Sequence, residues 1–135
     1  MKMKNKHNLI SAGAFFALLG VILGAFGAHA LNSRLEELDK VAVWNTAVNY
    51  QMWHALAILV IASSQLRSRA IQIAGACFCL GILLFSGSLY WLALDGPRWL
   101  GPVTPLGGLS FIAGWAAIIW AAITAPRREK ESVKT

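Results

Sequence analysis

The chain has 135 residues, which is the length of a single domain. Apolar residues make up 57% of it and charged residues only 13%, about half the share that a soluble domain carries. This composition excludes a disordered chain, a collagen-like chain and a disulfide scaffold, and it indicates a membrane protein. The formal net charge is +6, but most of the basic residues lie at the chain ends and in one short loop. We therefore expect no nucleic-acid partner.

Four stretches without Asp, Glu, Lys or Arg are long enough to cross a bilayer core, which takes about 20 apolar residues per helix. They are residues 9–30, 47–66, 70–94 and 105–125. Short connections join them, and a basic tail, 126–135, follows the last one. We predict an all-α polytopic membrane protein, with four transmembrane helices bundled in one domain. Thr104 is predicted to cap the fourth helix, with Pro105 at its first position.

The longest connection, residues 31–46, has an amphipathic pattern. Leu31, Leu35 and Leu38 form one apolar stripe, and Ser33 and Glu36 have the spacing of a capping box. We predict a short amphipathic helix that lies in the membrane interface after the first span.

The orientation follows from the distribution of Lys and Arg. Nine of these residues lie in the N-terminal segment, the connection between spans two and three and the C-terminal tail, whereas three lie on the other side. The positive-inside rule therefore predicts that both termini are cytoplasmic. Trp44, Trp91 and Trp99 are then expected at the outer membrane interface, where amphipathic rings are favoured.

The N-terminal segment has a second interpretation. Three lysines, an apolar run and Ala28-His29-Ala30 resemble a signal peptide with its cleavage site. The apolar run is longer than the usual 7–15 residues of such a segment, which favours a retained helix.

Small residues recur at helical spacing in the predicted spans. Gly20 and Gly24 form a GxxxG motif that Ala28 extends, and Gly107 and Gly114 mark one face of the fourth span. Such residues let helices approach closely in lipid. We predict that they pack the four helices together or against a neighbouring subunit.

The polar residues of the predicted spans gather toward one side, which the orientation makes the outer leaflet. They are His29, Asn49, Tyr50, Gln51, His54, Ser86, Ser88, Tyr90 and Thr104. Polar groups in lipid are costly unless they are partnered. Gln51 and His54 share a helix face, and His29 could approach them from the first span. We therefore predict one polar network at this depth.

Four interpretations of this network stay open. Two histidines on different helices are able to ligate haem or a metal ion, and histidine is able to relay protons. The network is also able to dock a partner's helix, or simply to hydrogen-bond the helix ends together. Two histidines are too few for a closed zinc site, and no intramembrane Asp or Glu completes a relay. We therefore expect no metal and no cofactor, and structural hydrogen bonding is favoured.

The sequence shows no combination of residues typical of a catalytic site. Cys77 and Cys79 are two residues apart on a helix, so they point to nearly opposite faces and read as small apolar residues. The Ser86-Gly87-Ser88 segment has no charged companion that would activate a nucleophile. We predict that the protein is not an enzyme.

Four blocks of sequence, in order, resemble a known family. The first is Gly24–Leu31, and the second consists of Trp44–Ala47, Tyr50-Gln51 and His54–Ala57. The third is Leu84–Tyr90, and the fourth is Thr104–Gly108 with Phe111, Gly114 and Trp115. These blocks are similar to the YgdD-like family of small bacterial inner-membrane proteins of unknown function, which has relatives in eukaryotic organelles. The resemblance implies four retained helices and a multi-pass location in the bacterial inner (plasma) membrane. It implies no reaction, substrate or catalytic residue.

The function expected from these observations is that of an accessory or scaffold protein. Such a protein docks on a larger membrane complex or self-associates, with the lipid bilayer as its medium. The alternative is a small protein that handles haem, metal or protons, or transports a solute, by means of His29 and His54.

Overall fold

The computed structural model describes residues 3–64 and 68–125 of the chain. The predicted basic tail, 126–135, and Arg67 in the predicted cytoplasmic loop lie outside the described residues.

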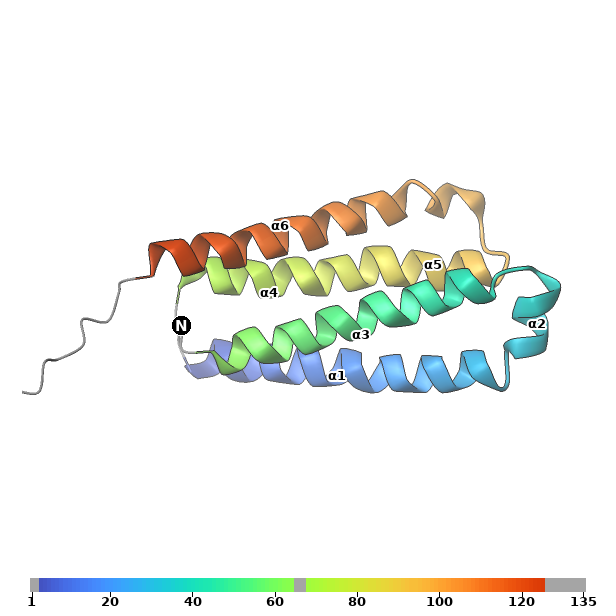
Figure 1. Cartoon of the computed structure of the whole chain (residues 1–135), viewed down its shortest axis with the longest axis horizontal. Coiled ribbons are helices and arrows are strands. Elements are labelled where there is room, and N and C mark those ends of the chain that lie inside the picture. The colour runs from blue at the N-terminus through green and yellow to red at the C-terminus, as the bar shows by residue number, and fades with distance from the viewer. Residues whose placement is uncertain (1–2, 65–67, 126–135) are drawn as a thin grey trace, which may run out of the picture.

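All regular secondary structure in the described ranges is helical. The elements are α1 (Met3–Ala28), α2 (Asn32–Glu37), α3 (Val41–Ser63), α4 (Arg69–Gly81), the π-helical turn η1 (Ile82–Ser86), α5 (Gly87–Ala93), the 3-10 turn η2 (Arg98–Leu100) and α6 (Val103–Thr124). The segments α4, η1 and α5 follow one another as one long rod, so four rods lie side by side (Figure 1). They form two helical hairpins, because α1 packs along α3, and α4 packs along α6.

Three rods are long and apolar enough to cross a membrane, as judged by length and composition within the described residues. They are Lys6–Ala28, Arg69–Ala93 and Arg98–Thr124. The remaining rod, α3, has 23 residues, but its N-terminal and middle turns carry Asn45, Asn49, Gln51 and His54. The second predicted span is thus the one whose composition is too polar to stand as a membrane span by itself.

A seven-residue repeat organises the packing. The buried residues of α3 that follow it are spaced alternately by three and four, and they are Trp44, Ala47, Gln51, His54, Ile58 and Ile61. This spacing is typical of helices that cross at about 20° in left-handed bundles. Small residues occupy the same repeat on the partner helices, as Gly13, Gly20 and Gly27 do on α1 and Gly107, Gly114 and Ala121 do on α6. Both hairpins are therefore close-packed along their length.

The small residues predicted to pack helices lie as follows. Gly20 faces the side chains of Met52 and Gln51 on α3, and Gly24 faces Val48 more loosely. Ala28 is exposed, so the row does not extend to it. The tightest contact of an α1 glycine with a side chain of α3 is instead at Gly27, where a Cβ atom would collide with the Trp44 indole.

The third predicted span is interrupted in its middle by the wider turn η1. Here the backbone N–H of Gly87 bonds to the carbonyl of Ile82, five residues earlier. Gly107 of α6 lies against this turn, and a Cβ atom on it would collide with the backbone nitrogen of Phe85. Such π turns inside α-helices are often found at functional sites.

The connection between α1 and α3 is shorter than predicted, because α3 begins at Val41 rather than at residue 47. The predicted capping box is wrong. The helix α2 begins at Asn32 with no side-chain cap, and Glu36 accepts a hydrogen bond from the Asn32 amide at 2.8 Å instead. Leu35 of α2 is buried against Trp44 and Ala93, so α2 closes this end of the bundle (Figure 1).

Two further expectations are wrong, one about the cap of the fourth helix and one about the position of a tryptophan. The helix α6 begins at Val103, so Thr104 is its second residue and not its cap. Trp44 is only 3% exposed, and its indole N–H donates to the carbonyl of Leu23 at 3.0 Å. It therefore belongs to the core and not to an interfacial belt, whereas Trp91 and Trp99 are exposed.

Candidate functional site

Gln51 joins three helices through its side-chain amide. Its Nε2 donates to the carbonyl of Phe16 on α1 at 2.8 Å. Its Oε1 accepts from the hydroxyl of Tyr90 on α5 at 2.9 Å. Gln51 is 3% exposed, and this arrangement links the two hairpins through one buried side chain.

His54 makes the second link between the hairpins. Its Nδ1 lies 2.8 Å from the carbonyl of Tyr50, one turn earlier on α3. Its Nε2 accepts from the indole N–H of Trp115 on α6 at 3.2 Å. Together these contacts require the neutral tautomer with the proton on Nδ1. Both ring nitrogens are therefore engaged inside the protein.

Aromatic rings surround His54 on two sides. Its ring stacks on Phe111 with the centroids 3.5 Å apart and the planes 9° apart. Phe78 of α4 lies 5.3 Å away and also contacts Trp115. Sequence reasoning missed Phe111, Phe78 and Trp115 as partners, although each lies on an apolar span at the same level as His54. Whether these rings contact His54 depends on which helices are neighbours, and no local sequence pattern indicates this.

Serine and threonine residues tie α6 to the α4–η1–α5 rod. Ser88 and Thr104 lie 2.7 Å apart through their hydroxyl oxygens, and Ser88 also donates to the carbonyl of Phe85. Ser110 donates to the carbonyl of Cys77 at 2.8 Å. The hydroxyl of Ser86 is buried in η1 without a hydrogen-bond partner among the described residues.

Two predicted members of the network lie outside it. Asn49 is exposed on α3. His29 follows the end of α1 and is exposed. The nearby Gly27 faces Trp44, which precedes His54 by ten residues, or about 15 Å of helix. The structure therefore does not bring His29 to His54.

The depth of the network also differs from the sequence expectation. Because α3 begins at Val41, Gln51 and His54 lie at its middle and not in its outer part. Gly20, which faces Gln51, lies well inside α1. The network is therefore central to the bundle, and only Ser88, Tyr90 and Thr104 lie nearer to the end with α2.

A groove of about 440 Å³ opens beside His54, between α3 and α6. Large aromatic side chains form most of its lining, which consists of Tyr50, Trp53, His54, Phe85, Gly108, Phe111, Ile112 and Trp115. Tyr50 stacks on Phe85 with ring centroids 4.6 Å apart. The hydroxyl of Tyr50 and the indole N–H of Trp53 have no hydrogen-bond partner among the described residues. The groove thus offers apolar walls and two hydrogen-bond donors.

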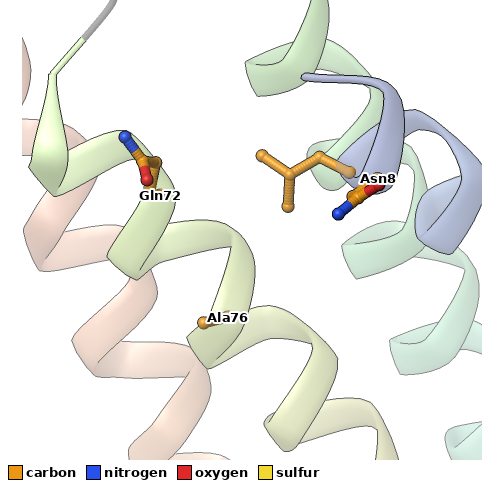
Figure 2. Close-up of a pocket in the computed structure, with 4 residues that line it drawn as sticks. Asn8, Gln72 and Ala76 are labelled. Atoms are coloured by element: carbon orange, nitrogen blue, oxygen red, sulfur yellow. The ribbon is translucent and has the colours of Figure 1, made fainter. Parts of the chain in front are cut away.

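Two other cavities lie nearer to the ends of the bundle. One of about 210 Å³ is lined by Asn8 and Leu9 of α1 and by Gln72 and Ala76 of α4. Figure 2 shows Asn8 on one side of this cavity and Gln72 and Ala76 on the other. The second, of about 450 Å³, lies at the end of α5 and is lined by Trp44, Tyr90, Trp91 and Asp95 among others.

The family model of DUF423, described as a protein of unknown function, matches residues 23–108. The chain belongs to this family. The match contains Gln51, His54 and Tyr90, and it agrees with the resemblance drawn from the four sequence blocks.

Curated relatives match over nearly their full length and are named as membrane proteins. The chain is 47% identical over 111 residues to the UPF0382 membrane protein SH2409 of Staphylococcus haemolyticus, covering 82% of this chain and 90% of the relative. It is 44% identical over 117 residues to YwdK of Bacillus subtilis, covering 84% and 94%. It is 41% identical over 128 residues to the UPF0382 inner membrane protein YgdD of Escherichia coli, covering 93% and 96%. No solved structure matches the chain.

The relatives and the apolar helices together make this DUF423 chain a membrane protein. The names of the relatives give no reaction, ligand or partner. The functional conclusion therefore rests on the geometry of the bundle.

Proposed function

We propose that this DUF423 chain is a four-span inner-membrane protein without a reaction of its own, which docks through its α3–α6 groove onto a transmembrane helix of another polypeptide. The observation that carries the proposal is an apolar aromatic groove at the middle of the helices that also holds two hydrogen-bond donors, Tyr50 and Trp53, without a partner among the described residues.

The proposal counts α3 as the fourth span. Its polar side chains Gln51 and His54 are buried against α1, α5 and α6, which removes their cost in lipid. The start of α1 and the end of α6 lie at the same end of the bundle (Figure 1). Arg34, Lys40 and Arg98 belong to the connections at the opposite end. Both features support cytoplasmic termini under the positive-inside rule.

The central polar side chains use their hydrogen-bonding groups within the bundle. Gln51 uses both ends of its amide and His54 both ring nitrogens in contacts that join helices. A general acid or base needs a free position within reach of a substrate. Because these side chains have none, we infer that they hold the bundle together.

The groove needs an occupant that lipid tails do not provide. A hydroxyl or an indole N–H in the hydrocarbon region is costly without an acceptor, and acyl chains carry none. A transmembrane helix supplies apolar side chains for the walls and a Ser, Thr or Asn oxygen for the donors. The groove is therefore suited to an apolar helix that carries one polar side chain.

A second copy of the chain fits this surface less well. An isologous dimer places the same patch of both copies in contact, so the patch must be complementary to itself. The groove is concave, and two grooves that face each other leave space between them. We therefore assign the groove to a different polypeptide.

The alternative of a haem, metal or proton function that uses His29 with His54 loses its geometric basis. His29 follows Gly27, which faces Trp44, and Trp44 lies about 15 Å along α3 from His54. A ligand on His54 would also have to displace Trp115 or the carbonyl of Tyr50.

Native mass spectrometry of the protein, extracted gently from its own membrane, tests the proposal. We expect a complex whose mass exceeds that of one chain by another polypeptide. Trp53→Ala, at the rim of the groove, should abolish the complex, whereas Trp120→Ala should leave it intact. Trp120 is a matched control because it is 62% exposed on α6, compared with 56% for Trp53, and lies outside the groove. A bare chain, a complex of two identical chains, or equal effects of the two substitutions would each contradict the proposal.

A further inference from the structure

The cavity at the end of α5 combines three features that favour a positively charged organic group. It has a volume of about 450 Å³ and is lined by Trp44, Tyr90, Trp91 and Asp95, with Leu23 and Leu94 beside them. We propose that this cavity binds an organic ammonium ion, held by its aromatic rings and by the Asp95 carboxylate. The cavity lies at one end of the bundle, away from the α3–α6 groove at its middle, and binding there does not depend on a partner protein.

The first feature is the aromatic wall. Trp44 and Tyr90 meet edge to face with ring centroids 4.8 Å apart. Their polar atoms are engaged elsewhere, since the Trp44 N–H donates to Leu23 and the Tyr90 hydroxyl donates to Gln51. What these residues offer to the cavity is ring surface, and tryptophan and tyrosine rings attract ammonium groups through their quadrupoles.

The second feature is the carboxylate of Asp95. It has no hydrogen bond or ion pair with any described residue, although it lines the cavity. Its backbone has a φ of 62°, a left-handed conformation that costs energy for a residue with a side chain, although Asp tolerates it better than most. This turn places a negative charge beside the rings.

The third feature is the end of the helical rod that α5 completes. The N–H groups of Leu94 and Gly96 both bond to the carbonyl of Trp91, which closes the last turn at the cavity. The carbonyl end of a helix carries a partial negative charge and favours cations. The charge of the rod end thus has the same sign as that of Asp95.

The basic side chains at this end of the bundle do not form an ion pair with the Asp95 carboxylate. Arg98 follows Asp95 by three residues and Lys40 precedes Trp44, yet neither forms an ion pair with Asp95. The ion pair that the described residues do contain joins Arg34 to Glu37 on α2. One carboxylate is too few for a dedicated calcium or magnesium site. An organic ammonium group, which aromatic rings also attract, therefore fits the site better than a metal ion.

Two kinds of molecule can supply the ammonium group. Trp91 and Trp99 are 65% and 69% exposed near this end of the rod, as expected of residues at the level of lipid headgroups. A phosphatidylethanolamine headgroup carries an ammonium group at that level, and a free amine in the adjoining aqueous phase carries the same group.

Isothermal titration of the full chain in detergent with tetramethylammonium and choline tests the site. We expect saturable binding of both, and none of 3,3-dimethylbutanol, the uncharged isostere of choline. Asp95→Asn and Trp91→Leu should each weaken binding about tenfold. The matched controls Glu37→Gln and Trp99→Leu, which change an acid and an exposed ring at the same end, should bind as the unaltered chain does.

Native mass spectrometry of retained lipid separates the two sources. Preferential retention of phosphatidylethanolamine over phosphatidylglycerol that is lost in Asp95→Asn would assign the site to a headgroup. Saturable binding of free amines without that preference would assign it to a soluble amine. Binding of the uncharged isostere with equal affinity, no saturable binding, or unchanged binding in both cavity variants would overturn the proposal. Asp95 and Trp91 are exposed, so circular dichroism should show both variants folded.

Discussion

At the residue scale, the central polar side chains act as connectors between hairpins. Polar residues inside a membrane are usually taken as markers of function. Gln51 and His54 instead have their donors and acceptors occupied by backbone and side-chain groups of α1, α5 and α6. Gln51 and His54, whose polar groups are costly in lipid, therefore lie where the two hairpins contact each other and fix their register.

Substitution of His54 should destabilise the bundle. His54→Ala removes a stacked contact with Phe111 and leaves the indole N–H of Trp115 without an acceptor. We expect a loss of about 2–3 kcal/mol in the free energy of unfolding, from the cavity and the unpaired donor together. Reversible unfolding in mixed micelles measures this, with His29→Ala as the exposed control. Equal stabilities of the two variants would show that the contacts of His54 with Phe111 and Trp115 do not contribute to the free energy of unfolding.

The Gln51–Tyr90 hydrogen bond should contribute less. Hydrogen bonds between membrane helices average about 0.6 kcal/mol in double-mutant cycles. A cycle of Gln51→Leu, Tyr90→Phe and the double variant should therefore give a coupling free energy below about 1.5 kcal/mol. A value near zero would mean that the two groups do not bond in the folded protein.

At the element scale, glycines set how closely the rods approach. Gly107 lies against the backbone of η1, whereas a Cβ atom on the neighbouring Gly108 would make only ordinary contacts, the nearest at 3.8 Å from a Phe85 ring atom. The two positions differ by one residue and by the face that they present. They form a natural pair for testing the close approach of α6 to η1.

We expect Gly107→Ala to destabilise the protein and Gly108→Ala to be nearly neutral. The added methyl group at Gly107 must push α6 away from a backbone that cannot yield, which costs about 2–3 kcal/mol. Thermal unfolding of both variants in detergent checks this. If both substitutions have the same effect, the close approach at η1 is not present in the protein.

The sequence predicted the four rods well because long uncharged stretches are a strong pattern. It placed the start of α3 six residues late, since Asn45 and Thr46 read as part of a polar connection. That error moved Gln51 and His54 from the middle of the bundle to its outer part. The glycines at positions 13, 20 and 27 carry a seven-residue repeat that was readable, whereas the GxxxG motif at Gly20 and Gly24 drew attention to a looser contact.

Only part of the membership of the candidate site was predictable, and its connections were not. His29 and Asn49 lie outside the network, and the rings around His54 were missed. Gln51, His54 and Tyr90 stand out by type within apolar stretches. Which rings stack on His54 depends on the pairing of α3 with α6, and helix pairing leaves no local trace in one sequence. The turn η1 was equally hidden, because Ile82–Ser86 reads as an ordinary apolar helix.

At the scale of the whole molecule, the two hairpins form a bundle whose charged residues lie at its ends. The account predicts that the end with α2 faces away from the cytoplasm. In a background of Cys77→Ser and Cys79→Ser, we expect Ser33→Cys to react with a membrane-impermeant maleimide in intact cells. Thr124→Cys should react only after permeabilisation. Both positions are exposed, so the reverse labelling pattern would mean that the orientation is inverted.

We propose that the α3–α6 groove holds a helix of another membrane protein. The most direct measurement is photo-crosslinking in living cells, with benzoylphenylalanine in place of Ile112 in the groove or of Ile119 outside it. These residues are similarly exposed on α6, at 66% and 63%, and only Ile112 lines the groove. The account predicts a discrete crosslinked polypeptide, different from this chain, from position 112 and none from position 119. Crosslinks to lipid alone at position 112, or the same products at both positions, would contradict it.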